Sequence, residues 1–109
     1  MGPIFGQFDR VQIFAYIYIL TNKPKSVFYT GVTNNLRKRL NLHHENIVSK
    51  NKTFALQYNV HFLLYYEKFT WIHDAIAREK EIKGWRREKK LELIKSINPD
   101  FEFLNYLFE

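Results

Sequence analysis

The strongest constraint on the fold is an unbroken apolar and aromatic run from Ile13 to Leu20. The run is short and rich in β-branched and aromatic residues, which favours a strand over a helix. Because none of its side chains is charged, both faces of this strand should be covered by other parts of the chain. A turn-like stretch at residues 21–26 and a second apolar stretch at residues 27–32 follow. We therefore predict an antiparallel hairpin with a buried first strand.

One helix and a third strand are predicted next. Capping side chains at residues 33–35 precede Leu36 and Leu40, whose spacing of four is that of an apolar helical stripe. A mostly apolar stretch at about residues 60–66 predicts the third strand.

Two further helices are predicted after this strand. Thr70 is the expected N-cap of the first, and Gly84 its expected end. Its inward face holds Ile72, Ala75, Ile76, position 79 and Ile82. A very basic helix at about residues 87–96 should stop before the Asn98-Pro99 pair.

The length of 109 residues is that of one domain, and a 46% hydrophobic composition supplies a core without disulfides. We expect an N-terminal arm at residues 1–12, a domain at 13–98 and a C-terminal tail at 99–109 that packs on the domain. The chain has no cysteine, which excludes thiol nucleophiles and cysteine-ligated zinc and fits a cytoplasmic protein.

The sequence carries no signal for membrane insertion or export. No apolar stretch approaches the roughly 20 residues of a membrane-spanning helix, and the N-terminus does not resemble a signal peptide. We therefore expect a protein that is neither membrane-bound nor exported.

The charge of the chain points to a polyanion as partner. Its formal net charge is +6, which makes nucleic acid the first partner to consider.

Glu79 is the most unusual residue of the predicted helices, because it lies on an apolar helical face. A carboxylate buried there without a partner would cost several kcal/mol. One candidate partner is a cation of the same helix: Arg78, Lys80 or Lys83. The other is a hard divalent cation such as Mg²⁺, which binds one or two carboxylates together with water and phosphate.

Arg39 and His43 are four residues apart on the first predicted helix, at the border of its buried stripe. The planar guanidinium of an arginine matches phosphate oxygens and stabilises the charge that develops in phosphoryl transfer. The alternative is that the basic run at residues 37–39 is a solvated face.

The tyrosines of the hairpin can likewise be interpreted as structural residues or as catalytic ones. Tyr16, Tyr18 and Tyr29 would ordinarily pack a sheet. A phenol has a pKa near 10, so a tyrosine that acts as a base at neutral pH needs nearby positive charge from an arginine or a metal. This requirement links the tyrosines to Arg39 and Glu79. No phosphate-binding loop of the Walker type, no pair of carboxylates for two metals and no serine nucleophile motif is present.

The chain resembles the GIY-YIG nuclease superfamily in a set of motif residues that follow one another in the same order: 16–18, 29–31, Arg39, His43 and Glu79. Tyr16 stands where the superfamily has glycine, as is usual in its small stand-alone bacterial subfamily. The chain looks closest to that subfamily through the stretches 16–22, 29–34 and 77–87. Larger relatives include the incision domain of bacterial nucleotide-excision repair.

The resemblance implies an α+β fold, with a three-stranded antiparallel sheet flanked by helices. It implies an endonuclease that hydrolyses the phosphodiester bonds of nucleic acid, with DNA as the expected substrate and a single Mg²⁺ or Mn²⁺ held by Glu79. Tyr18 and Tyr29 would provide the general base and position the attacking water, with Tyr29 the preferred base. Arg39 would stabilise the transition state and His43 would assist by hydrogen bonding or proton transfer. Asn98 matches a late polar residue that supports the site in some relatives.

The remaining basic residues have no assigned chemistry. Candidates for phosphate contacts are Arg37, Lys38, Arg86, Arg87 and Lys90. A catalytically silent nucleic-acid-binding module is the main alternative, and a protein-interaction domain is the third. Because no DNA-recognition domain is evident, sequence specificity would come from this domain, from a partner protein or not at all.

Overall fold

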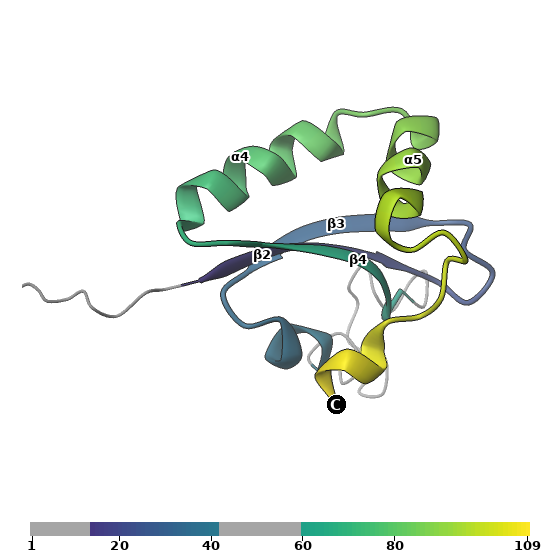
Figure 1. The fold of residues 1–109 in the computed structure, drawn as a ribbon, viewed down its shortest axis with the longest axis horizontal. Coiled ribbons are helices and arrows are strands. Elements are labelled where there is room, and N and C mark those ends of the chain that lie inside the picture. The colour runs from purple at the N-terminus through teal and green to yellow at the C-terminus, as the bar shows by residue number, and fades with distance from the viewer. Residues whose placement is uncertain (1–13, 42–59) are drawn as a thin grey trace, which may run out of the picture.

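A computed structural model of the chain describes residues 14–41 and 60–109 (Figure 1). Its centre is a three-stranded antiparallel sheet of β2 (Ala15–Thr21), β3 (Phe28–Thr33) and β4 (Phe62–Phe69), in the order β3-β2-β4. This sheet and its flanking helices confirm the predicted α+β fold, and the pairing of β2 with β3 confirms the hairpin. The predicted arm at residues 1–12 lies outside the described residues.

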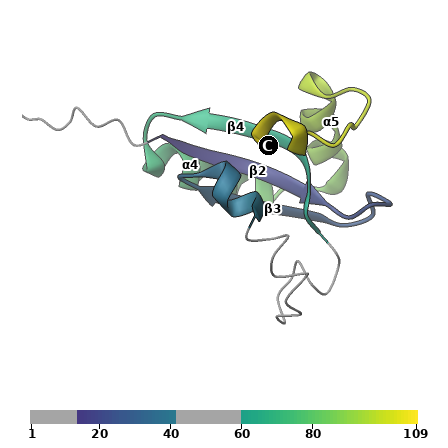
Figure 2. The same ribbon diagram turned by 90° about the horizontal axis from the view of Figure 1, so that it is seen from below.

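Helices cover both faces of the sheet, as Figures 1 and 2 show. On one face lie α4 (Ile72–Lys83) and α5 (Arg87–Ile97). On the other lie a helix that begins at Leu36 and the 3₁₀ helix η1 (Asn105–Phe108). This layering explains why the central strand could be made almost wholly of apolar residues.

Each face of the sheet has its own apolar core. Ala15, Ile17 and Ile19 of β2 are buried against residues of α4 and α5. Tyr18 and Leu20 point to the other face, where they are buried with side chains that include Leu36, Leu40 and Leu63. The alternation of a strand therefore divides β2 between the two cores.

The helix ends depart from prediction at one place. Asn35 caps the first helix as expected, since its Oδ1 accepts the Lys38 N–H at 3.1 Å. Gly84 ends α4 as expected, with its N–H bonded to the carbonyl oxygens of the preceding turn. The assignment of Thr70 as N-cap was wrong, because Trp71 holds that position without a side-chain hydrogen bond.

The cause is the length of β4, which was predicted to end at about residue 66 and runs to Phe69. Glu67 and Lys68 pair with Ile17 and Tyr16 of β2. The strand thus continues through two charged residues, leaving only Thr70 and Trp71 for the turn into α4.

The C-terminal segment is tied to β4 by backbone and amide hydrogen bonds. Leu104 N–H donates to Leu63 O at 2.7 Å, and Asn105 accepts from Leu63 N–H at 2.8 Å. Buried Asn98 donates to the Leu64 and Glu102 carbonyl oxygens, both at 2.9 Å. Asn98 therefore joins α5, β4 and the C-terminal segment.

Candidate active site

Tyr18 and Gly31 lie directly opposite each other in the β2–β3 pair. A Cβ atom added to Gly31 would lie 2.5 Å from Cζ of Tyr18 and closer still to its hydroxyl oxygen. The phenol therefore lies across the backbone of Gly31, on the side of the edge strand β3. The absence of a side chain at Gly31 leaves the space that this phenol occupies.

Four of the five predicted catalytic residues converge around this phenol. Tyr18 interacts electrostatically with Tyr29, Arg39 and Glu79, and it also forms a hydrogen bond with the Arg39 side chain. The ring centroids of Tyr18 and Tyr29 are 6.3 Å apart. The fifth residue, His43, lies outside the described residues.

These residues reach the site from both layers of the fold. Tyr18 and Tyr29 belong to the hairpin, and Arg39 to the helix on the sheet face towards which Tyr18 points. Glu79 comes from α4, which lies on the opposite face. The group is therefore assembled from three parts of the chain on the β3 side of the sheet.

Burial is the main influence on the Tyr18 phenol, and it raises the pKa of Tyr18 to about 12. Tyr29 and Glu79 raise the pKa further, whereas the charge and hydrogen bond of Arg39 lower it. At neutral pH Tyr18 is therefore protonated in the metal-free protein and acts as a hydrogen-bond donor. The half-buried Tyr29 is the more accessible of the two phenols.

The raised pKa of Tyr18 predicts a loss of stability in alkali. The unfolded chain releases the proton near pH 10, whereas the folded protein retains it to about pH 12, so the free energy of unfolding falls as the pH rises through this window. Denaturant unfolding in EDTA at a series of pH values measures the effect. Tyr65, whose pKa is also raised by burial, contributes in the same direction. Comparison with Tyr18→Phe isolates Tyr18, and equal slopes in the two proteins would contradict the prediction.

Glu79 has a cation partner within its own helix. Its side chain is 14% exposed, and its Oε2 lies 2.8 Å from Nζ of Lys83, one turn further along α4. Of the three helical cations considered from the sequence, Lys83 is the one ion-paired to Glu79. The same carboxylate interacts with the Tyr18 phenol, so the ion pair lies within the candidate site.

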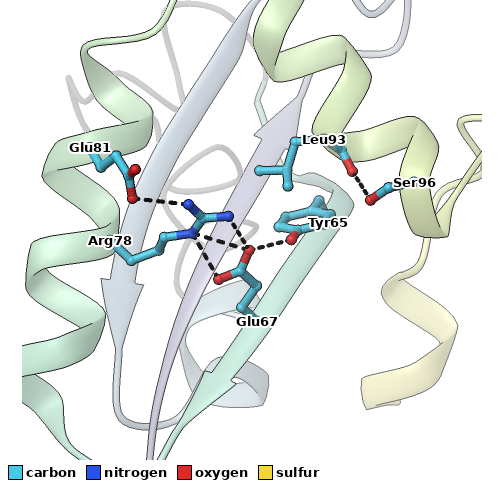
Figure 3. Close-up of polar contacts among 6 residues, drawn as sticks. All are labelled: Tyr65, Glu67, Arg78, Glu81, Leu93 and Ser96. Atoms are coloured by element: carbon cyan, nitrogen blue, oxygen red, sulfur yellow. Dashed lines mark hydrogen bonds and ion pairs between the residues drawn. The ribbon is translucent and has the colours of Figure 1, made fainter.

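Arg78, the residue before Glu79, fastens α4 to β4 (Figure 3). Its Nε lies 3.1 Å from Oε1 of Glu67, its Nη2 lies 3.0 Å from Oε2 of the same carboxylate, and its Nη1 lies 2.9 Å from Glu81. The Tyr65 phenol donates to Glu67 from the other side. The guanidinium also lies 5.2 Å from the centroid of the Trp85 ring.

The contacts of Arg78 with Glu67 and Glu81 help to set the direction of the Glu79 side chain. Successive residues of an α-helix are rotated by about 100° around its axis. With Arg78 fixed towards β4, the Glu79 side chain is directed to a different side of α4, from which its charge acts on the Tyr18 phenol. The sequence suggested Arg78 only as a partner of Glu79, because nothing local indicates that Glu67 faces the helix.

Two of the basic residues considered for nucleic-acid binding have structural contacts. Arg37 donates from Nε to the Phe108 carbonyl oxygen at 2.9 Å. Arg87 donates to the carbonyl oxygens of residues 25 and 26 in the hairpin turn and lies over the Phe28 ring. The other three candidates are fully or partly exposed: Lys38, Arg86 and Lys90.

The described part of the chain holds neither a larger cluster of metal ligands nor a helix that could cross a membrane. Within residues 14–41 and 60–109, three or more His, Cys, Asp or Glu side chains nowhere gather as they would around a fully protein-ligated metal. Over the same residues, no helix combines the length and apolar character needed to cross a membrane.

Comparison with known proteins places these residues in context. Residues 14–92 match the model of the GIY-YIG catalytic domain. The chain is 40% identical over 81 residues to a UPF0213 protein of Clostridium perfringens, covering 74% of this chain and 83% of that protein. It is 34% identical over 79 residues to a UPF0213 protein of Staphylococcus haemolyticus, covering 72% and 92%. The solution NMR structure of a UPF0213 protein from Bacillus halodurans matches with a TM-score of 0.52 and 27% identity, over 85% of this chain and 93% of that one.

Proposed function

The chain belongs to the GIY-YIG family, in the small stand-alone bacterial group named UPF0213, and on this basis we propose that it is a divalent-metal-dependent endonuclease acting on DNA. Family membership supports a nuclease-type enzyme and a nucleic-acid partner. The observation that carries the finer proposal is the convergence of Tyr18, Tyr29, Arg39 and Glu79 on the β3 side of the sheet.

The donor set fits one Mg²⁺ or Mn²⁺ ion. Glu79 offers a single, mostly buried carboxylate, and in the described residues no larger cluster of ligands is formed. Mg²⁺ commonly binds through one or two carboxylates and keeps its other positions for water and substrate phosphate. When bound beside Glu79, the ion would supply Lewis-acid stabilisation of negative charge on the phosphate.

The protein's own side chains perform the remaining steps of the proposal. Arg39 binds the phosphate and stabilises the charge that builds up in the transition state. Tyr18, protonated at neutral pH, donates a hydrogen bond that orients the reacting groups. Tyr29, the more accessible of the two tyrosines, is assigned as the general base that accepts the proton of the attacking water, a role that a tyrosine performs as the phenolate. We assign His43 an assisting role in hydrogen bonding or proton transfer.

A nicking assay tests this function. Supercoiled plasmid and branched DNA are incubated with the protein and Mg²⁺, Mn²⁺ or EDTA, with an RNA duplex of matched sequence in parallel. We expect DNA cleavage that requires a divalent cation. A Glu79→Gln protein, purified identically, controls for a contaminating nuclease and should be inactive. If DNA is bound but left intact with every metal, the silent nucleic-acid-binding module is the correct assignment.

A further inference from the structure

The Lys83–Glu79 ion pair occupies the carboxylate on which the proposed function depends. The Lys83 ammonium is 2.8 Å from Glu79 Oε2, and the two side chains are 52% and 14% exposed. An approaching cation therefore meets a carboxylate that already has a positive partner. Since that partner comes from the next turn of the same helix, the pair forms without any rearrangement of the fold.

The surroundings of Glu79 explain why its carboxylate needs a positively charged partner such as the Lys83 ammonium. A carboxylate that is largely withdrawn from water is costly unless its charge is compensated. Glu79 also lies close enough to the Tyr18 phenol to disfavour phenolate formation there. Without a divalent ion, the Lys83 ammonium compensates the charge that Glu79 brings to the site.

The pair is also easily opened. Lys83 is half exposed, and such ion pairs contribute little to stability because solvent screens them and the long side chain loses freedom. A lysine ammonium is a compact charge on a flexible stem, so it can leave a carboxylate oxygen without moving the helix. Arg78 behaves differently, because several hydrogen bonds to two carboxylates fix it in place.

We infer that Lys83 is a built-in counter-ion of the metal site, which neutralises Glu79 in the metal-free protein and is displaced when the divalent cation binds. This inference rests on the proposed function, since it takes Glu79 as the metal ligand. It goes further by making Lys83 a competitor of the metal. The affinity of the site for Mg²⁺ or Mn²⁺ is then set partly by a residue that binds no metal.

Mn²⁺ binding to the full chain, followed by the electron paramagnetic resonance signal of free Mn²⁺, tests the inference without DNA or activity. Lys83→Met removes the charge and keeps an unbranched side chain. Lys80→Met is the matched control, because Lys80 is exposed on the same helix and has the same charge. Relative to Lys80→Met, we expect Lys83→Met to bind Mn²⁺ about two- to fivefold more tightly, as an ion pair of modest strength requires. Lys83→Arg, which keeps the cation, should not show this gain.

Glu79→Gln separates this inference from the proposed function. If Glu79→Gln loses Mn²⁺ binding but Lys83→Met binds no more tightly than Lys80→Met, the counter-ion role is wrong and the metal assignment stands. If Glu79→Gln binds Mn²⁺ like the wild type, the ion does not bind at Glu79 and both assignments fail. Tighter binding by Lys83→Met together with loss in Glu79→Gln supports both.

Discussion

Gly31→Ala should destabilise the protein by about 1–3 kcal/mol, as overpacking in a core does, and should abolish the proposed nuclease activity. The added methyl group would lie 2.5 Å from Cζ of Tyr18 and 3.0 Å from its Cε1. Since Tyr18 is fully buried, its ring can move towards solvent only by displacing its neighbours. Either β3 or the phenol must shift, and both belong to the candidate site.

Denaturant unfolding and the nicking assay measure the two effects of Gly31→Ala. Gly84→Ala is the matched control, because a Cβ there would lie 3.6 Å or more from the nearest neighbouring atoms, and the backbone φ of −80° suits alanine. That change should be neutral or stabilise by up to about 1 kcal/mol. The cost of Gly31→Ala should also shrink in a Tyr18→Ala background, because the clashing ring is absent. An undiminished cost would show that the clash with Tyr18 is not its cause.

Arg39→Met should lower the single-turnover rate of the proposed DNA cleavage by about a hundred- to a thousandfold, the usual cost of removing one charge-stabilising group. Arg39 is the cation that hydrogen-bonds the Tyr18 phenol, and its helix brings it to the site from the face opposite α4. Arg39→Lys keeps the charge but loses the planar fork, so its rate should be intermediate.

A charge-matched control and a second measurement accompany Arg39→Met. Lys95→Met removes one positive charge from an exposed position of α5 and should cleave at the wild-type rate. Because Arg39 lowers the pKa of Tyr18, its removal should also shift the alkaline titration of Tyr18 to higher pH, as seen in phenolate absorbance. A normal cleavage rate in Arg39→Met would remove Arg39 from the proposed mechanism.

The sequence was most informative where local pattern and burial agree. The apolar run of β2 predicted a strand covered on both faces, and Ile17 and Tyr18, which point in opposite directions, are both fully buried. Asn35 and Gly84 were recognised at helix ends because their roles depend on nearby backbone groups. These features require knowledge of only a few neighbouring residues.

The sequence was least informative where distant residues determine the structure. The end of β4 was misplaced because Glu67 is stabilised there by Arg78, eleven residues away, and Lys68 by the Phe14 ring. For Glu79, the sequence suggested three possible cations without favouring one. Lys83 lies at the i,i+4 spacing that favours an ion pair on a helix, and the structure shows that Arg78 is instead paired with Glu67 of β4.

The distribution of the candidate site along the chain has a practical consequence. Tyr18, Tyr29 and Arg39 belong to the described segment 14–41, whereas Glu79 belongs to the segment 60–109. The two segments meet where β4 pairs with the central strand β2, and each alone holds an incomplete set of groups. The molecule is therefore suited to fragment complementation: two separately expressed halves, each inactive, would report their reassociation by recovering a function that neither possesses.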